Sequence, residues 1–512
     1  MNKRSAATLA VVVLGCLPAI AAAQVFDGLI LYNPNNNRTT YLKDTTWQTV
    51  NSWMGSVSCA YSAYLMPDSS IWRGDVNSGA TMRGAAYGGL MQQYDWDGDV
   101  IESFVWSNSD HQQHHDFYPM SNGHLLLVSW DRKTAAEAQA LGRQNVSGDI
   151  WPDEVIEYDP VGDSVAWEWH FWDHLIQDVD STKPNYGVIS EHPELLNINV
   201  GQVLGGDWMH CNTVDYNADR DEIVLTSHNL HEIYVIDHST TTAEAAGHSG
   251  GNRGKGGDFL YRWGNPQNYE RGTSADRIFY VVHGANWIRS GMPGAGDIIV
   301  LNNGNRSGTS GDSSSIVQIT PPLDSSDHYY IHPDSGFGPA TPTWMYSNGR
   351  SFYADHLGGA YRLPNGNTLA ILGTNGIFDE IAPDGQIVWA RGGAGQLGHP
   401  MKYARDFSTG TIESHAVQQL CRFESVGPNP FVTTTSLRYV IPSRSRVALS
   451  VVDATGRLVQ RLTHCTQDAG SHAATFAPGR HLAAGVYFAR LEATPTSGGQ
   501  QQVVTRILVK EH

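Results

Sequence analysis

Residues 355–392 read DHLGGAYRLPNGNTLAILGTNGIFDEIAPDGQIVWARG, and two features of this stretch recur through much of the chain. The first is a histidine, His356, followed by a turn rich in Gly and Asn and then by a short aliphatic run. The second is an alternating apolar strand, a Gly-containing turn and a strand that closes on Trp389. Alternation between turn residues is typical of antiparallel hairpins. The stretch therefore predicts a module of four antiparallel strands that begins at a histidine.

Three more histidines, His115, His210 and His283, each precede a turn rich in Gly, Asn or Asp and a short aliphatic run. The spacing is 73 residues from His210 to His283 and 73 again to His356. The second feature recurs as GLMQQYDWDGDVIESFVW, DEVIEYDPVGDSVAWEWHF and HEIYVIDHSTTTAEAAG. Modules of roughly 50 to 75 residues that repeat in this way predict a β-propeller or a related array of four-stranded units.

The modules can be placed along the chain, one per blade, at residues 65–106, 115–170, 208–264, 283–322 and 356–392. We expect residues 28–53 and the later segment 413–423 to supply strands for a sixth blade that closes the ring. A convincing helical pattern is limited to TAAEAQALGRQ, from Thr134. The predicted fold is therefore all-β: a six-bladed β-propeller followed by a small C-terminal Ig-like β-sandwich.

The two ends of the chain differ from this pattern. Lys3 and Arg4 precede an apolar stretch and a run of alanines that ends at residue 23, which is typical of a secretory signal peptide. Lipoprotein cleavage at Cys16 is the alternative. We divide the chain into a signal peptide at 1–23, a propeller at 24–425 and a β-sandwich at 426–512. The expected product is a bacterial export substrate, secreted, periplasmic or on the cell surface, with no transmembrane segment.

Composition excludes several classes of function. The formal net charge is −18, so the protein is a poor candidate for binding nucleic acid or an anionic membrane. An anionic substrate would need a local positive site. The cysteines beyond the leader, Cys59, Cys211, Cys421 and Cys465, form no Cys-x-x-Cys pair, so neither thiol redox chemistry nor a thiolate metal site is indicated.

The repeated histidine is the best indication of function. The innermost strands of a propeller line its central channel, so equivalent residues on several of them meet around the axis. A neutral imidazole is a nucleophile, a general base or a metal ligand, and its cation binds oxyanions. The pattern predicts one shared site, although hydrogen bonding between blades is an alternative interpretation.

Three motifs resemble the aryl-sulfate sulfotransferases: DWMHCN at 207–212, NNG at 302–304 and GAYRLPNGN at 359–367. The resemblance runs from about residue 28 to residue 391. It implies a propeller that moves a sulfuryl group from a phenolic sulfate to another phenol. The family uses no phosphoadenosine-phosphosulfate, and a histidine is sulfated transiently in a ping-pong cycle.

The same resemblance implies roles for four residues. His356 would be the nucleophile, and His210 and His283 would polarise the sulfuryl oxygens or handle the phenolic proton. Arg306 would balance the anionic charge. His115 shares the setting of the other histidines but receives no role. The implied partners are a phenolic sulfate donor and a phenol acceptor, with no cofactor and no metal ion.

The C-terminal region resembles a different group of proteins. PNPF at 428–431, the Asp-x-x-Gly-Arg turn at 453–457 and LAAGVYF at 482–488 are similar to FlgD-like immunoglobulin domains and to the sorting domains of type IX secretion substrates. This resemblance implies recognition by a secretion machinery.

Two other functions remain open at the level of sequence. One is a metal-dependent hydrolase in which the histidines, with Asp116, Asp207 or Asp355, hold the metal, although no HxH or HExxH spacing is present. The other is a non-catalytic secreted propeller that binds glycans or proteins through loops such as residues 251–259.

Overall fold

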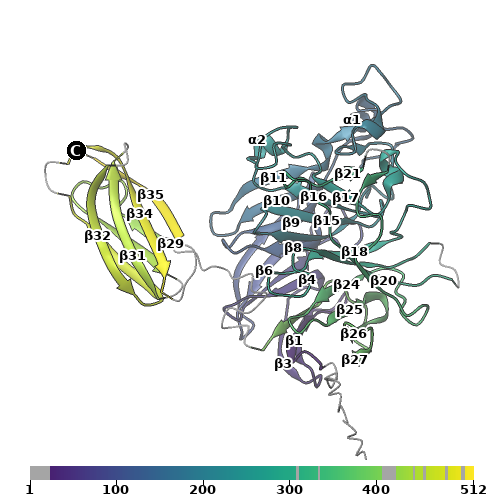
Figure 1. Cartoon of the computed structure of the whole chain (residues 1–512), viewed down its shortest axis with the longest axis horizontal. Coiled ribbons are helices and arrows are strands. Elements are labelled where there is room, and N and C mark those ends of the chain that lie inside the picture. Colours follow the sequence, from purple (N-terminus) through teal and green to yellow (C-terminus); the bar gives the residue numbers. More distant parts are fainter. Residues whose placement is uncertain are drawn as a thin grey trace, which may run out of the picture. The chain divides into compact units, whose positions relative to one another are not determined.

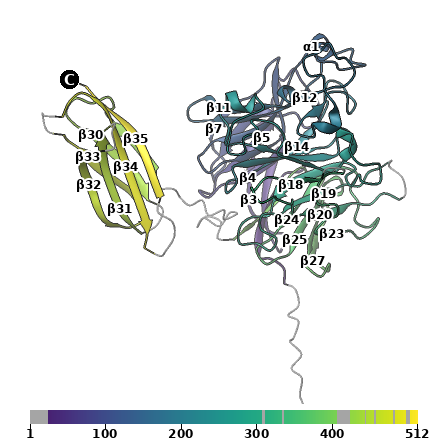
Figure 2. The same ribbon diagram turned by 45° about the horizontal axis from the view of Figure 1, so that its top comes forward.

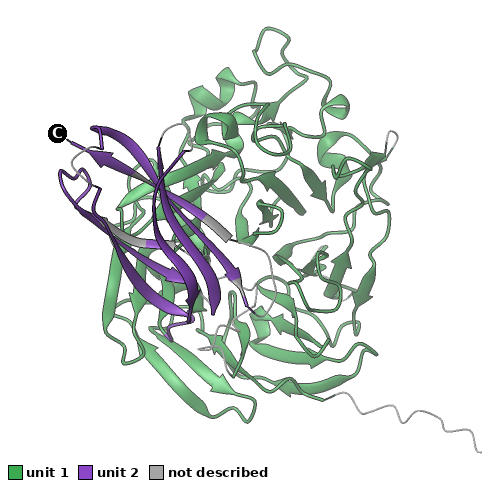
Figure 3. Cartoon of the chain, turned by 60° about the vertical axis from the view of Figure 1, so that its left-hand side comes forward, with its two compact units in different colours: residues 1–65, 70–405 green, residues 66–69, 406–512 purple. Residues whose placement is uncertain are grey.

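The computed structural model describes residues 24–511 except for seven short segments: 307–310, 333–334, 406–421, 442–443, 454–456, 479–481 and 497–501. The expected signal peptide and most of the segment 413–423 lie outside the described residues. The chain forms two compact units (Figure 3). Unit 1 comprises residues 1–65 and 70–405, and unit 2 comprises residues 66–69 and 406–512.

In the described part of unit 1, six four-stranded antiparallel sheets follow one another along the chain (Figures 1 and 2). Each sheet is one blade. The first contains β1 (Gly28–Tyr32), β2 (Thr39–Asp44), β3 (Thr49–Met54) and β28 (Met401–Ala404). The second contains β4 (Cys59–Leu65), β5 (Ile71–Val76), β6 (Gly89–Tyr94) and β7 (Val100–Val105). The third contains β8 (His111–Pro119), β9 (Leu125–Asp131), β10 (Asp153–Asp159) and β11 (Ser164–His170).

The other three blades repeat this order. The fourth contains β14 (Cys211–Asn217), β15 (Glu222–Ser227), β16 (Glu232–Asp237) and β17 (Tyr261–Trp263). The fifth contains β18 (Val282–Trp287), β19 (Ile298–Asn302), β20 (Ser315–Ile319) and β23 (Trp344–Tyr346). The sixth contains β24 (Gly358–Arg362), β25 (Thr368–Leu372), β26 (Ile377–Ile381) and β27 (Ile387–Arg391). The first strands of successive blades, β4, β8, β14, β18 and β24, contact one another and are therefore the inner strands.

Short elements lie in the loops between these strands. Helices α1 (Ala135–Ala140) and α2 (Thr242–Ala245) each begin at a threonine whose side chain and the glutamate three residues on form a capping box. The remaining short elements are η1 (Phe171–Asp173), β12 (Leu175–Ile176), η2 (Ile189–Glu191), β13 (Leu196–Asn197), η3 (Pro266–Tyr269), β21 (Ile331–His332), β22 (Gly336–Phe337) and η4 (Gly373–Asn375). No described helix is long and apolar enough to cross a membrane.

The blades pack face to face through their apolar strands. Buried side chains of blades three and four share one cluster, those of four and five a second, and those of five and six a third. A fourth cluster joins the sixth blade to the first, for example Phe378 and Tyr361 to Ile30 and Tyr32. Because the last blade packs against the first, the six sheets form a propeller. The predicted all-β fold with six blades is confirmed.

The strand that completes the first blade differs from the expected one. The inner neighbour of β1 is β28, which pairs with it antiparallel from Gly28↔Ala404 to Leu31↔Met401. The expected closing segment, residues 413–423, was wrong, since Arg422 and Phe423 begin β29 in unit 2. The physical reason is the length of the connection. A short connection after the sixth blade places β28 against the free edge of β1, whereas the expected segment lies farther along the chain and belongs to unit 2.

A buried ion pair fixes this closing strand to the sixth blade. Lys402 on β28 contacts Glu380 on β26 at 2.5 Å, and both side chains are fully buried. The second oxygen of Glu380 accepts hydrogen bonds from the backbone N–H of Phe26 and the side chain of Asn367. A buried charge pair is stable only when such extra bonds satisfy it, so Glu380 joins the two ends of the propeller.

Unit 2 is a β-sandwich. One sheet contains β29 (Arg422–Gly427), β30 (Thr435–Ile441) and β33 (Gly470–Phe476). The other contains β31 (Ser445–Asp453), β32 (Leu458–Gln467), β34 (Gly485–Pro495) and β35 (Gln502–Lys510). Alternate residues of both sheets, such as Leu437, Tyr439, Leu449 and Leu491, form the buried core. The boundary proposed at 425/426 falls within β29.

A histidine in the interface between blades three and four generates a stability prediction. His238, after β16, contacts Asp221 at 2.7 Å through Nδ1 and Glu157 on β10 at 2.9 Å through Nε2. Burial lowers the pKa of His238, but these hydrogen bonds outweigh it and raise that pKa to about 9. Burial raises the pKa of Glu157, but its hydrogen bonds lower it to about 2.

We expect His238→Ala to destabilise the protein by about 2 kcal/mol at pH 7. Because the folded pKa is raised, the stabilisation is complete below pH 6.5 and is lost as the pH rises through 9. Calorimetry between pH 6 and pH 10 should show a steeper fall of Tm in the wild type than in the variant. His328→Ala, at an exposed position, is the control. Equal slopes in wild type and His238→Ala would contradict the assignment.

Candidate active site

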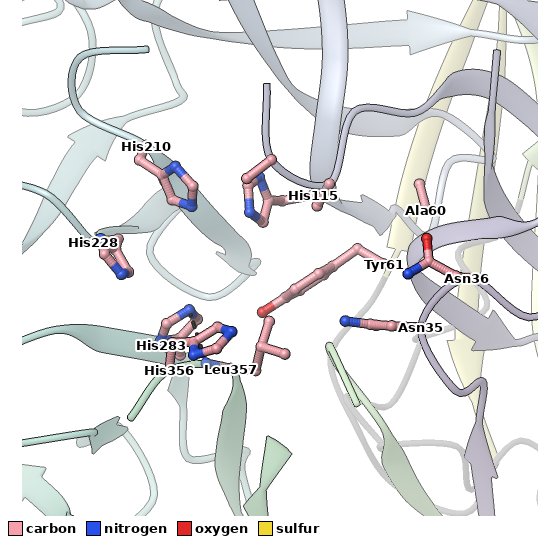
Figure 4. A pocket seen from close by; sticks show the side chains of 12 residues that line it. Asn35, Asn36, Ala60, Tyr61, His115, His210, His228, His283, His356 and Leu357 are labelled. Carbon is pink, nitrogen blue, oxygen red and sulfur yellow. Dashed lines mark hydrogen bonds between the residues drawn. The ribbon is translucent and has the colours of Figure 1, made fainter. Parts of the chain in front are cut away.

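The five histidines that meet at the inner strands line a single cavity of about 270 Å³ in unit 1 (Figure 4). They come from the third to the sixth blades: His115, His210, His228, His283 and His356. The first and second blades and their loops complete the wall with Asn35, Asn36, Ala60, Tyr61, Ala85 and Ala86, and Leu357 follows His356. The expected convergence of four histidines is thus present, and His228 is a fifth.

Backbone geometry at the inner strands turns the imidazoles into the cavity. His115 and His210 have φ of +49° and +55°, in the left-handed region that non-glycine residues rarely adopt. Leu357, directly after His356, has φ +64°. Such conformations cost energy and are found where the surrounding structure holds them for a purpose. Here the positive φ values interrupt the alternation of side chains between the two faces of the strand. The interruption falls at the point where each histidine side chain faces the propeller axis.

His228 reaches the cavity through strand register. It follows β15, whose last residue, Ser227, pairs with Cys211 at the start of β14. The backbone N–H of His228 donates to the carbonyl of His210 at 3.1 Å, and the two imidazole rings lie 4.8 Å apart. In an antiparallel hairpin the end of the second strand lies beside the start of the first. This rule was the available signal for His228, which the prediction from histidines at strand starts does not include.

Residues at the same register position in the next two blades support the histidines there. Asn303, after β19, accepts from Nδ1 of His283 at 2.7 Å. Thr374, after β25, donates to Asp355 at 2.7 Å, and Asp355 contacts Nδ1 of His356 at 2.8 Å. His356 therefore has its Nδ1 held by a carboxylate and its Nε2 available. Its side chain is 43% exposed, which makes it the most accessible imidazole of the cavity.

His210 is also held by a carboxylate. Asp207 contacts its Nδ1 at 2.5 Å, and both side chains are largely buried. Burial lowers the pKa of His210, but the hydrogen bond and charge of Asp207 outweigh it, so that pKa is raised above its ordinary 6.5. The pKa of Asp207 is lowered, because the hydrogen bond from His210 outweighs burial. The Asp207 carboxylate therefore favours the cationic form of His210.

The other buried histidines are neutral. Burial, reinforced by the charge of His210, lowers the pKa of His228 to about 4. Burial and the neighbouring histidines hold the pKa values of His115 and His283 well below the ordinary value. A positive charge on one imidazole therefore disfavours a second charge on its neighbours. In this cavity the cationic form is favoured at His210 and disfavoured at His115, His228 and His283.

Both ring nitrogens of His283 are already bonded within the protein. Nδ1 contacts Asn303, and Nε2 accepts the backbone N–H of Leu357 at 3.3 Å. The expected contact of His283 with a sulfuryl oxygen would require Nε2 to release that N–H. In the present geometry His283 holds the turn that carries His356.

A buried chain of hydrogen bonds ends on His115. Asp153 contacts Nε2 of His114 at 2.7 Å, and Nδ1 of His114 contacts Nδ1 of His115 at 2.8 Å. The Asp153 carboxylate accepts a hydrogen bond from Nε2–H of His114, so in the neutral form of His114 the Nδ1 atom accepts from Nδ1–H of His115. This fixes the tautomer of His115 and leaves a lone pair on its Nε2.

Tyr61 supplies a polar group that is unpaired within the described part of the chain. Its side chain is 1% exposed, and its hydroxyl has no hydrogen-bond partner among the described residues. Figure 4 shows this hydroxyl pointing into the cavity toward His283 and His356. A buried hydroxyl without a partner is unfavourable unless a ligand satisfies it. Tyr61 is therefore a candidate donor to a bound anion, and no motif in the sequence identified it.

Arg306 lies outside the cavity wall. It is exposed, and its guanidinium stacks 4.8 Å from the ring centre of Tyr280. The three aspartates weighed as metal ligands are each bonded to a histidine Nδ1: Asp207 to His210, Asp355 to His356 and Asp116 to His399. Their positions are those of orienting groups for imidazoles.

The fold and the site together define a propeller protein with a histidine-lined site at the inner strands. The chain belongs to the arylsulfotransferase (ASST) family, whose model matches residues 66–409. No curated protein matches the chain.

The solved structures to which the chain is similar match it at low identity and low TM-score. A protein of unknown function from Bacteroides caccae is 9% identical, with a TM-score of 0.41, and covers 73% of this chain and 98% of its own. The β-propeller domain of Cps50 (Swd1) from Myceliophteria thermophila is 9% identical, with a TM-score of 0.33 and coverages of 72% and 85%. The Dos1 propeller is 9% identical, with a TM-score of 0.31 and coverages of 80% and 73%.

The protonation states of the cavity can be measured directly. In ¹⁵N-histidine-labelled protein we expect the ring nitrogens of His210 to titrate above pH 6.5, because Asp207 stabilises the cation. Those of His228 should remain neutral down to pH 5. The variants His210→Asn and His228→Asn assign the signals. A cationic His228 beside a neutral His210 at pH 6 would reverse the electrostatic description given above.

Proposed function

We propose that the protein transfers a sulfuryl group from a phenolic sulfate ester to a phenol through a sulfohistidine on His356. Membership in the arylsulfotransferase family supports the general activity. The observation that supports this nucleophile is the Asp355–His356 pair, in which a carboxylate holds Nδ1 and the accessible ring leaves Nε2 open to the cavity. The same arrangement activates histidine in other enzymes that use an imidazole base or nucleophile.

The first half-reaction forms a nitrogen–sulfur bond and breaks the bond between sulfur and the aryl oxygen. Nε2 of His356 attacks the sulfur atom, and Asp355 stabilises the positive charge that develops on the ring. The phenolate leaves with the bonding electrons and takes a proton from the imidazolium of His210. A neutral phenol and a sulfated His356 result.

The second half-reaction reverses these bonds with another phenol. His210, now neutral, accepts the phenolic proton as the phenol oxygen attacks sulfur, and the nitrogen–sulfur bond breaks. His356 returns to its starting state and His210 is again protonated. Asp207 makes this exchange possible, because its carboxylate raises the proton affinity of His210.

Charge on the sulfuryl oxygens would be stabilised by donors in the cavity wall. The Tyr61 hydroxyl points into the cavity and can donate to these oxygens, and the cationic form of His210 adds positive charge to the same wall. A buried donor aimed at developing charge contributes about 3 kcal/mol to such a transition state. Arg306 remains a proposed partner for the anion, although its exposed position would require movement of its loop.

Export and sorting complete the proposal. We place a signal peptide at residues 1–23 and a domain for recognition by secretion machinery at residues 426–512, which rests on the motifs PNPF and LAAGVYF. The cavity accepts a small substrate, and no cofactor enters the two half-reactions as written.

The nucleophile can be trapped. Incubation with 4-nitrophenyl sulfate without acceptor should add a labile sulfuryl group to the peptide that contains His356. His356→Ala should lose the adduct and at least about 10³-fold in kcat, as expected for removal of a nucleophile. His328→Ala is the surface control. An adduct on another histidine would refute this nucleophile and keep the mechanism, whereas no adduct and no turnover would refute both.

The role of His210 is tested by leaving-group dependence. Asp207→Asn removes the carboxylate that favours the cation, so kcat/KM should begin to fall at a lower pH than in the wild type. At pH 7 the loss should be on the order of 10²-fold for phenyl sulfate and smaller for 4-nitrophenyl sulfate, whose phenolate needs little protonation. Asp97→Asn, on an exposed turn, is the control. Equal losses of kcat/KM for both esters would show that His210 does not protonate the leaving phenolate.

A further inference from the structure

Three donor atoms converge at a second place in unit 1, away from the central cavity. Nδ1 of His174, Nδ1 of His248 and Oδ1 of Asp258 all lie within 4.8 Å of one another. His174 follows η1 and is fully buried, whereas His248 stands on a Gly-rich loop after α2 and is 62% exposed. The sulfuryl-transfer mechanism uses none of these residues.

The hydrogen bonds of His174 fix which of its nitrogens is available. Nε2 lies 2.9 Å from the carbonyl oxygen of Ala245, an acceptor that requires an N–H. Nδ1 is then the nitrogen that faces Asp258, at 2.9 Å, and it is the one that a metal ion between the two side chains would contact. Metal-bound histidines typically donate their second N–H to a backbone carbonyl in this way.

The position of the His174 ring is enforced by close packing. The ring stacks on Trp169 at 5.5 Å with an interplanar angle of 8°. Gly257 lies against it, and a Cβ there would come within 1.9 Å of the Ala245 oxygen and 2.5 Å of Nε2. The backbone oxygen of Gly257 in turn accepts from the Trp169 indole at 2.7 Å. Rigid support of this kind suits a preorganised ligand.

One oxygen of Asp258 serves both imidazoles. Oδ1 lies 2.9 Å from His174 and 2.7 Å from His248. Among the described residues, Asp258 forms no ion pair with a lysine or arginine that would neutralise it. Two imidazole nitrogens and one carboxylate oxygen are the donors of His₂Asp metal centres.

A second histidine–carboxylate group in unit 1 provides a contrast. His111, Asp131 and Glu154 also converge, but Lys133 contacts Asp131 at 2.7 Å and His170 contacts both carboxylates. The ammonium of Lys133 already occupies the place of a cation. That group is a salt-bridge network between protein side chains.

We propose that His174, His248 and Asp258 bind one divalent transition-metal ion, with zinc as the preferred class. Tetrahedral zinc holds its ligands about 2.0–2.2 Å from the metal, which separates them by about 3.3 Å. The separation of 2.7 Å between His248 and Asp258 reaches that value by a small rotation of exposed His248. The separation of 2.9 Å between His174 and Asp258 reaches it by a small shift of the Asp258 carboxylate. Magnesium and calcium are disfavoured, because they require oxygen ligands.

The site leaves a fourth position for water or another ligand. His248 also lines a cavity of about 350 Å³, together with Trp172, Asp173, Tyr186 and His192. Binding would fasten the Gly-rich loop of His248 to the buried histidine after η1 and fix the wall of this cavity. The metal thereby stabilises the folded unit and leaves the central histidines untouched.

Metal binding by the full-length chain tests the proposal. After chelation and dialysis, calorimetric titration with zinc should show binding at one site. Bound zinc should stabilise the protein and raise its Tm. His248→Ala and Asp258→Asn should weaken this site at least about 100-fold. His192→Ala, from the wall of the same cavity, and His111→Ala, from the salt-bridge network, should retain it. Cobalt(II) should give tetrahedral visible bands that His248→Ala abolishes, and magnesium should leave Tm unchanged.

Several outcomes would overturn the proposal. They are the absence of zinc binding in the wild type, equal affinity in His248→Ala, and loss of the site in His111→Ala. Zinc that remains in His248→Ala but is lost in His228→Ala occupies the central cavity instead. Because His248 and Asp258 lie outside the sulfuryl-transfer site, this test is independent of the proposed activity.

Discussion

The antiparallel pairing of β28 with β1 is the constraint on which the rest of the propeller depends. This pairing joins the end of unit 1 to its beginning. The buried Lys402–Glu380 ion pair then connects β28 to the sixth blade. An open array of sheets would leave the inner strands free to splay. Closure instead fixes the inner strands around one axis, so side chains from residue 35 to residue 357 line a single cavity.

The crowding that closure produces decides the chemistry of the cavity. Five imidazoles in one small space cannot all be protonated, because each positive charge opposes the next. Asp207 favours the charge on His210, and burial disfavours it on His228. The outcome is one cavity that contains both His210, whose cationic form is favoured, and the accessible His356, although the protein as a whole is strongly acidic. A local cation, rather than net charge, would draw an anionic substrate.

Much of this arrangement was predictable from local patterns. Alternating apolar strands and Gly-containing turns predicted the blades, and the recurring histidine predicted the shared site. The prediction of the closing strand was wrong. Residues 401–404 and 413–423 are both short segments after the sixth blade, and only the folded structure shows that the nearer one pairs with β1. His228 was missed because only histidines at strand starts were considered, although its place at the end of the second hairpin strand sets it beside His210. Tyr61 was missed because its strand interior does not reveal the direction in which the side chain points. Arg306 was chosen by motif, and the structure places it on the surface.

The sequence by itself determined the strand-forming modules, their number and the histidines at their starts, because these depend on residue alternation and turn chemistry over a few neighbours. Tertiary structure alone decided which strand closes the ring, which carboxylate or amide holds each imidazole and which imidazole carries charge. Those properties depend on contacts between residues far apart in the chain, such as Asp153 with His114 or Asn303 with Leu357. The meeting of His174, His248 and Asp258 is of the same kind, since 84 residues separate His174 from Asp258.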